Sequence, residues 1–176
     1  MKRWQIGAAL ALLIAIGMAM FVALNREDEA SLAVPPMSLK GTRTIELLFP
    51  GFRGGVARES REIVSEDSLE GDVRTAIEAL IAGSEQGARP VPAATIVRNV
   101  FWDGEGELTI SFSEHLRSDH PGGSEAEFAT LRSIVGTIGT SFPGVDAVRI
   151  LIEGDVVSSL AGHADLSHPL RTADFR

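Results

Sequence analysis

Two segments of this 176-residue chain carry apolar residues along one side only, at the spacing of an α-helix. The first is LEGDVRTAIEALIAG, residues 69–83. Its stripe consists of Leu69, Val73, Ile77, Leu80 and Ile81. Ser68 is placed to cap the first turn, and Gly83 to end the helix. A helix of this kind is stable only where its apolar side covers another element, so the rest of the chain must supply that surface.

The second amphipathic segment begins near Ser124 and continues to about residue 142. The residues expected to be buried are Phe128, Leu131, Val135, Ile138 and Phe142. Ser124 and Glu127 have the spacing of a capping box, which predicts the start of the helix. Gly136 and Gly139 lower helix propensity, and we interpret them as positions where the helix closely approaches a sheet.

The remaining apolar runs alternate with polar residues, which is typical of strands with one buried face. They comprise residues 42–50 (TRTIELLFP), a charged edge candidate at 56–65 (VARESREIVS), 95–102, 107–112 and 147–153 (AVRILIE). The two middle runs are joined by DGEG, which predicts a hairpin.

The predicted order is strand, strand, helix, strand, strand, helix, strand. Apolar residues make up 44% of the chain, which is enough for a globular core. We therefore predict one α+β domain over residues 42–173, with an antiparallel or mixed sheet of about five strands and both helices packed on one face.

The N-terminal segment predicts a membrane anchor over residues 1–24. Lys2 and Arg3 precede a charge-free apolar run, residues 6–24, which as a helix is about 28 Å long and close to the thickness of a bilayer core. By the positive-inside rule, the following domain is extracytoplasmic, so the chain is expected to be a single-pass protein of the cell membrane. The alternative is a signal peptide cleaved after its small residues Gly17 and Ala19. Residues 25–41, which include Pro35-Pro36, are predicted to be a flexible linker.

Charge and cysteine content exclude several classes of function. The formal net charge is −8, so the surface repels phosphate backbones and nucleic acid is not an expected partner. The chain has no cysteine, which excludes disulfides, cysteine-ligated metals, thiol catalysis and a lipidated cysteine.

The stretch EGDVVSSLAGHADLSHPL, residues 153–170, holds the one grouping of metal-ligand residue types. Glu153, His163, Asp165 and His168 could form a site for a metal-assisted hydrolase. The two histidines are five residues apart, however, so they would not share a helix face, and Gly162 indicates a loop. The alternative is a closing turn in which Asp165 accepts backbone N–H groups and the histidines make ordinary hydrogen bonds.

A second candidate is a serine nucleophile with a nearby base, drawn from Ser111, Ser113, Glu114, His115 and His120. The G-x-S-x-G elbow is absent, and neighbouring residues on a strand point to opposite faces. The simpler interpretation is that these residues form the end of the strand at 107–112 and the loop that follows it.

Three weaker patterns have structural explanations. The acidic run beginning at Asp103 lacks the ligand periodicity of a calcium loop and favours a hairpin turn. The GFRGG loop at 51–55 could bind an anion through its amides, but no helix starts directly after it. Phe101 and Trp102 are expected to be one exposed and one core aromatic, as in any strand.

The ordered set of motifs resembles the sporulation and spore germination (GerMN) domain family. The motifs are ELLFPG, ARESREIV, AIEALIAG, VFWDGEGELTISFSEHL, GGSEAEFATLRSIVGTIGTSFPGVDAVRILIEG and EGDVVSSLAGHADLSHPL, which together cover nearly all of residues 42–171. The chain departs from the family after the first helix, where no proline follows Gly83. The resemblance implies that the HADLSH turn closes the domain and has no catalytic role.

The resemblance also implies an extracytoplasmic, non-enzymatic binding or assembly module of the cell envelope, linked to sporulation or peptidoglycan remodelling. The expected partners are an envelope protein or peptidoglycan, the membrane through the N-terminal helix, and possible further copies of the chain. No catalytic, cofactor-binding or metal residue is assigned, and no cofactor is expected. The alternatives are the hydrolase built on His163, Asp165 and His168, and a ring-forming structural domain.

Overall fold

The computed structural model describes residues 41–176, which pack around one hydrophobic core. The anchor predicted over residues 1–24, and nearly all of the linker predicted over 25–41, lie outside the described residues. Within residues 41–176, no helix is both long enough and apolar enough to cross a membrane. Because the core is complete within this part of the chain, we expect it to fold on its own.

The chain first forms a long hairpin. Strand β1 (Thr42–Pro50) and strand β2 (Val56–Val64) pair antiparallel over their full length. A short 3-10 turn, η3 (Phe52–Gly54), joins them. The inward side chains Ile45, Leu47 and Phe49 of β1 are at most 1% exposed, as the alternation of the sequence predicts.

Helix α2 (Leu69–Ala82) follows the prediction closely. The Ser68 hydroxyl accepts a hydrogen bond from the Gly71 N–H at 3.0 Å and so caps the helix. Gly83, with φ of 94°, ends it. Val73, Ile77 and Leu80 are fully buried, whereas Leu69 and Ile81 lie at the border of the core.

The other strands form a second, mixed sheet of five strands. They are β3 (Val97–Trp102), β4 (Glu107–Phe112), β5 (Ala147–Ile152), β6 (Asp155–Val156) and β7 (Leu170–Arg171). The order is β3-β4-β5-β6, and β7 also pairs with β5. Strands β4 and β5 are parallel, and the other pairs are antiparallel. The predicted hairpin is confirmed as β3 and β4.

Three helical segments complete the fold: α3 (His115–Ser118), α4 (Ser124–Ser141) and η4 (Thr172–Asp174). In the second predicted helix, now α4, the residues Leu131, Val135 and Ile138 are fully buried, and so is Phe142 beyond it. Phe128 is 46% exposed, so the prediction that it belongs to the core is wrong. The buried stripe is instead extended by Ile134.

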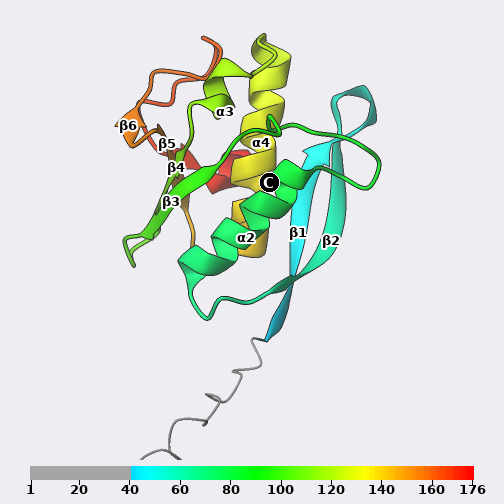
Figure 1. Ribbon diagram of the computed structural model, residues 1–176, viewed down its shortest axis with the longest axis vertical. Helices are drawn as coiled ribbons and strands as arrows, with labels where there is room; N and C mark the ends of the chain where they lie inside the picture. Colours follow the sequence, from blue (N-terminus) through cyan, green and yellow to red (C-terminus); the bar gives the residue numbers. More distant parts are fainter. Residues whose placement is uncertain (1–40) are drawn as a thin grey trace, which may run out of the picture. The chain divides into compact units, whose positions relative to one another are not determined.

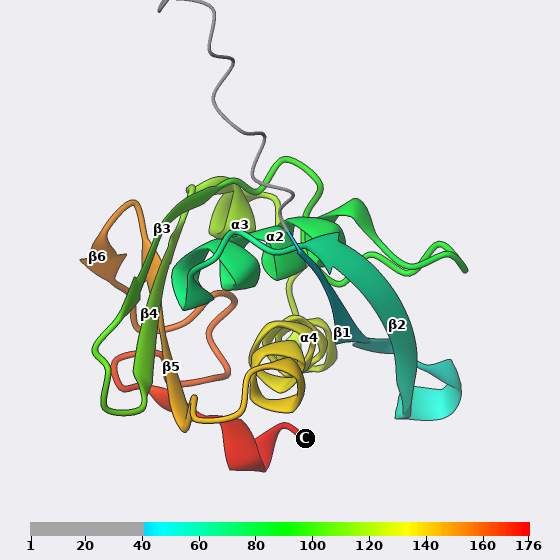
Figure 2. The ribbon, with the colours of Figure 1, turned by 90° about the horizontal axis from the view of Figure 1, so that it is seen from below.

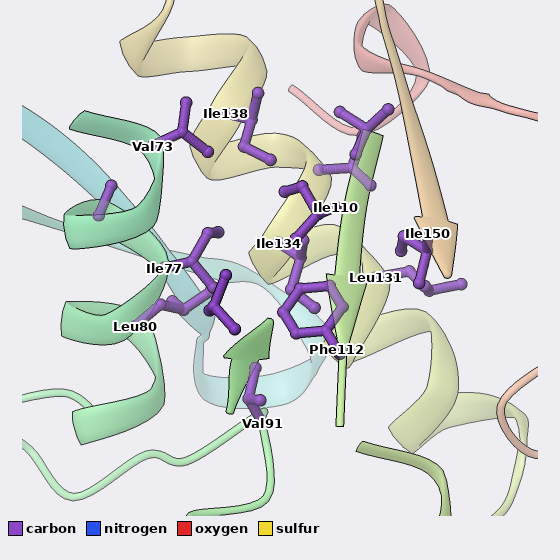
Figure 3. Close-up of a cluster of buried hydrophobic side chains, with 14 of the residues drawn as sticks. Val73, Ile77, Leu80, Val91, Ile110, Phe112, Leu131, Ile134, Ile138 and Ile150 are labelled. Carbon is purple, nitrogen blue, oxygen red and sulfur yellow. The ribbon is translucent and has the colours of Figure 1, made fainter. Parts of the chain in front are cut away.

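The prediction of a single sheet is also wrong, although the α+β class is confirmed. Helices α2 and α4 form a middle layer between the β1–β2 hairpin and the five-stranded sheet (Figure 2). Their apolar side chains meet both sheets, and Ile134 and Ile138 of α4 approach Ile110 of β4 (Figure 3). The helices therefore cover one face of the larger sheet, and a separate hairpin covers their other side.

The separation of the two sheets follows from how the inner edge of β1 is paired. Among residues 41–176, no strand lies along this edge; α4 lies there instead. The Thr137 hydroxyl accepts a hydrogen bond from the Leu48 N–H at 2.9 Å. The Ser141 hydroxyl accepts from the Glu46 N–H and donates to the Glu46 carbonyl, both at 2.9 Å. Two side chains one helical turn apart thus take the place of a third strand.

The helix glycines lie at close approaches, but the predicted approach to a sheet is confirmed for Gly136 alone. A Cβ atom at Gly136 would lie 2.6 Å from the Phe175 carbonyl oxygen and 2.8 Å from a methyl group of Leu48. A Cβ atom at Gly139 would lie 2.6 Å from Thr172. The neighbours are thus strand β1 and the segment around η4.

Candidate functional site

The C-terminal loop is organised by the buried carboxylate of Glu127, a residue that the sequence pattern predicts to be part of a capping box. Glu127, in the first turn of α4, has an exposed fraction of 0%. Its Oε1 accepts hydrogen bonds from the N–H groups of Leu160 (2.9 Å) and Ala161 (3.0 Å), and its Oε2 accepts from the N–H of His163 (2.9 Å). The capping-box prediction is therefore wrong: Gly123 occupies the N-cap position, and no side chain caps α4.

The backbone donors keep the Glu127 carboxylate charged in spite of its burial. Burial alone raises the pKa of a carboxyl group, because the charged form loses its hydration. Here the N–H groups of Ala161, His163, Leu160 and Ala164 outweigh burial, and the pKa of Glu127 lies below its ordinary value. The site therefore stabilises a fixed negative charge; it does not hold a proton in readiness for transfer.

Of the four residues of the candidate metal cluster, only Asp165 and His168 lie close together, with Asp165 Oδ2 3.6 Å from His168 Nδ1. His163 Nδ1 lies 3.3 Å from Glu127 Oε2, whereas His168 Nδ1 lies 2.9 Å from the Ser167 hydroxyl. Glu153 pairs with Arg98 at 3.0 Å instead. Among residues 41–176, no group of three or more His, Cys, Asp or Glu side chains is arranged to hold a metal ion.

Asp165 acts within a turn. Its Oδ1 accepts a hydrogen bond from the Ser167 N–H at 2.9 Å, the geometry of an Asx turn. Hydrogen bonds from the Ser167 hydroxyl and N–H lower the pKa of Asp165, so it too is a carboxylate at neutral pH. The arrangement matches the closing-turn interpretation of this stretch.

The serine candidates are also used for structure. The Ser111 hydroxyl accepts a hydrogen bond from the Gly154 N–H, and the Ser113 hydroxyl accepts one from the Ile96 N–H, both at 2.9 Å. The nearby histidines have other partners. His115 contacts Asp119, and His120 contacts Thr130. No serine–histidine pair is formed by these residues.

Asp103 shapes the β3–β4 turn as predicted. Its Oδ1 accepts hydrogen bonds from the N–H groups of Glu105 (2.7 Å), Gly106 (3.0 Å) and Glu107 (3.1 Å). These bonds lower the pKa of Asp103. In β3, Phe101 is 63% exposed and Trp102 packs against the core, which confirms that one aromatic is exposed and one is internal.

A groove lies on the side of α4 opposite the C-terminal loop. The tip of the β1–β2 hairpin lies beside the N-terminal half of α4 (Figure 1). The groove between them has a volume of about 260 Å³. It is lined by Phe49, Pro50, Val56, Phe128, Ala129 and Arg132, with Leu48, Glu125 and Ser133 and the glycines of the tip.

Exposed apolar side chains lie in the groove and in the hairpin tip that supplies its glycines. Phe52, at the hairpin tip, is 89% exposed, and the Arg53 guanidinium lies 5.3 Å from the centre of its ring. Phe128 and Val56 are 46% and 41% exposed. Apolar groups left in water at adjoining positions favour a surface that is covered by a partner.

The backbone of the tip holds Phe52 outward. Arg53 has a φ of 56° and Gly54 a φ of 79°, so the chain makes a tight left-handed turn directly after Phe52. Sequence reasoning missed this site because it searched the GFRGG loop for anion binding. The available signal was an aromatic residue between glycines, in a loop joining two strands.

Glu127 and Phe128 are neighbours in sequence and serve the two sides of α4. Successive helix residues are about 100° apart, so one side chain reaches the C-terminal loop and the other lines the groove. The backbone N–H groups of the loop are hydrogen-bonded to Glu127 within the domain, whereas the groove presents apolar side chains to solvent. The groove is therefore the better candidate for a functional site.

These features define an α+β domain in which the candidate catalytic and metal-binding residues maintain the fold and an apolar groove remains open. The family model "Germane: Sporulation and spore germination" matches residues 47–158. The chain belongs to this family, as the resemblance noted from its motifs predicted. The search of curated proteins found no match.

Two solved structures resemble the chain. A protein described as "Putative Lipoprotein from Clostridium perfringens" is 27% identical, with a TM-score of 0.54 over 76% of this chain and 89% of that one. The tandem GerMN domains of the sporulation protein GerM from Bacillus subtilis are 16% identical, with a TM-score of 0.54. That match covers 80% of this chain and 49% of the other, and it supports the fold alone.

Proposed function

We propose that this chain is a non-enzymatic binding or assembly module of the cell envelope, and that it is held at the membrane by its N-terminal segment with the domain on the extracytoplasmic side. Membership of the sporulation and spore germination family supports this function. The observation that carries it is the groove between the hairpin tip and α4, with Phe128 in its lining and the exposed Phe52 in the hairpin tip.

The chemistry of the groove favours a protein partner over peptidoglycan. A glycan is recognised through many hydrogen bonds to its hydroxyl groups, and the groove is lined mainly by phenylalanine, proline, valine and alanine. Apolar side chains of a polypeptide fit such a surface, and Arg132 and Glu125 at the border can orient them. We therefore propose an envelope protein as the partner.

Photo-cross-linking in cells of the source organism tests this function. A photoreactive phenylalanine analogue at position 52 of the full chain should give a discrete cross-linked product. The same analogue at position 101 is the matched control, because Phe101 is also exposed but lies on the other sheet. A product at position 52 that disappears in Phe128→Asp supports the proposal. Equal products at both positions, or no product at position 52, contradict it.

The peptidoglycan alternative has its own measurement. Purified sacculi are incubated with residues 41–176 and sedimented, and the bound fraction of the wild type is compared with that of Phe52→Ser. Sedimentation with sacculi that is lost in Phe52→Ser would assign the groove to glycan and overturn the choice of a protein partner. We expect the domain to stay in the supernatant.

A further inference from the structure

Strand β2 is the open edge of the two-stranded sheet. Within the described residues it pairs with β1 alone. The N–H groups of Glu46 and Leu48 point to α4, so the alternating residues Ile45 and Leu47 are those that bond to β2. It follows that every second residue of β2 directs its backbone N–H and C=O away from the sheet. These residues are Val56, Arg58, Ser60, Glu62 and Val64.

The outward residues are also exposed along the whole strand. Val56 and Val64 at its two ends are 41% and 50% exposed, and the three polar residues between them are exposed as well. Figure 1 shows β2 along one side of the domain, with β1 between it and α4. An edge of nine residues that no strand covers within residues 41–176 is a template for another strand.

The sequence of β2, VARESREIV, is self-complementary about its central residue, Ser60. Residues at equal distances on the two sides of Ser60 have opposite charge or are both apolar. The pairs are Glu59 with Arg61, Arg58 with Glu62, Ala57 with Ile63, and Val56 with Val64. If two copies of β2 met antiparallel with their Ser60 residues opposite each other, every residue would face its complement.

Charges on an edge strand commonly prevent pairing, which is the competing explanation. That protection works best when like charges would face each other, since like charges directly opposite are destabilising. Here the order of signs reverses at Ser60, so the exposed Arg58 and Glu62 of an antiparallel copy would meet opposite charges. The charge pattern therefore favours pairing between two copies of β2.

The structure also leaves the outer charges available. Glu59 and Arg61 point inward and pair with each other at 3.0 Å, and Arg61 donates to the Gly83 carbonyl at 2.7 Å. Within the described part of the chain, Arg58, in contrast, forms one ion pair, with Glu46 at 3.1 Å, between two side chains that are nearly half exposed. An exposed pair of this kind is weak, so Arg58 is free to face Glu62 of a second copy.

We propose that two copies of this chain pair through β2, antiparallel and with Ser60 on the two-fold axis, and so join their hairpins into one four-stranded sheet. The interface is isologous, which means that the same strand serves both partners. This distinguishes the dimer from a ring, whose interfaces join two different surfaces. The edge of β2 shares Val56 with the groove, and the residues from Ala57 to Val64 do not line it, so the proposal does not rest on the function proposed above.

Charge exchange tests the proposal. Sedimentation velocity on residues 41–176 should show a monomer–dimer equilibrium. Because each substitution acts twice across the two-fold axis, Arg58→Glu should weaken association at least about 10-fold. The double variant Arg58→Glu/Glu62→Arg restores opposite charges and should recover association to within about threefold. Wild-type protein that stays monomeric at millimolar concentration, or a double variant no better than the single one, would overturn the proposal.

Cross-linking tests the register independently, even if a charge variant fails to fold. Because the chain has no cysteine, Ser60→Cys introduces its one thiol. Across the two-fold axis these thiols lie opposite each other, and a short bifunctional thiol reagent should link them. Arg58→Cys is the matched control, because its two copies would be about 13 Å apart, four residues along the strands. Equal cross-linking of the two variants would contradict the register.

Discussion

The two surfaces on either side of the N-terminal half of α4 use opposite chemistry. Residues 160–168 contain the histidines and carboxylate that attract attention in the sequence, yet their backbone donors turn inward to Glu127. The hairpin tip at residues 51–55 contains no ionisable candidate except Arg53, and it leaves Phe52 89% exposed. Histidines and carboxylates, which indicate catalysis or metal binding in a sequence, thus maintain the fold here. Phenylalanines, which indicate a buried core, form the exposed surface.

The largest expected effect is at the buried carboxylate. Glu127→Ala leaves several backbone N–H groups of the C-terminal loop without an acceptor, and we expect a loss of roughly 3–5 kcal/mol in the free energy of unfolding. Urea melts measure it. Glu125→Ala, in the same turn but at the groove, is the control and should cost less than about 0.5 kcal/mol. A similar loss in both variants would remove the distinction between the two sides of α4.

The same carboxylate should make stability depend on pH. The folded-state pKa of Glu127 is lowered, so its stabilisation is present above the unfolded-state pKa, near 4.5, and is lost as the pH falls through the folded-state value. Glu127→Gln cannot be charged. We therefore expect the stability difference between wild type and Glu127→Gln to be largest at neutral pH and to shrink below pH of about 4. A difference that stays constant from pH 7 to pH 3 would contradict the role of the charge.

A smaller effect is expected where α4 pairs with β1. Thr137→Val removes the acceptor of the buried Leu48 N–H and should cost about 1–3 kcal/mol. Thr140 on the same helix is the control, because its hydroxyl is buried and has no hydrogen-bond partner in the part of the chain described. Thr140→Val should be neutral or slightly stabilising. If the two variants lost equal stability, the Thr137 hydroxyl would not stabilise the edge of β1 by accepting a hydrogen bond from the Leu48 N–H.

The smallest expected effect on stability is at the tip. Phe52→Ser removes a side chain that contacts little of the folded domain, so its free energy of unfolding should change by less than about 0.5 kcal/mol. Thermal and urea melts measure this. A loss above about 2 kcal/mol would mean that Phe52 is part of the core, and the comparison between the two surfaces would fail.

The helices and the β3–β4 hairpin could be predicted because their signals are local. The stripe Val73, Ile77 and Leu80, the Ser68 cap and the DGEG turn all act within a few residues. The family could be inferred from the order of its motifs. These parts of the fold depend on periodicity and turn chemistry, which a sequence states directly.

The division into two sheets could not be predicted, because it depends on contacts between distant residues. Thr137 and Leu48 are 89 residues apart in sequence, and a hydroxyl within a helix gives no local sign that it will bind a strand. The role of Glu127 likewise depends on distant residues. Its spacing from Ser124 matches a capping box, which led to the wrong prediction. Its position four residues before Leu131, on the buried stripe of α4, was the signal that its side chain turns inward.

The bond network of Glu127 also has a consequence for the order in which the domain assembles. Chains are made from the N-terminus, so α4 is complete before residues 160–164 are available. Until then the carboxylate has no donors, and burying it would leave a bare charge in an apolar setting. We expect the helix layer to close only when the last segment arrives, 33 to 36 residues later. We therefore expect the nascent domain to stay loosely packed until residues 160–164 have emerged, and then to fold in one step.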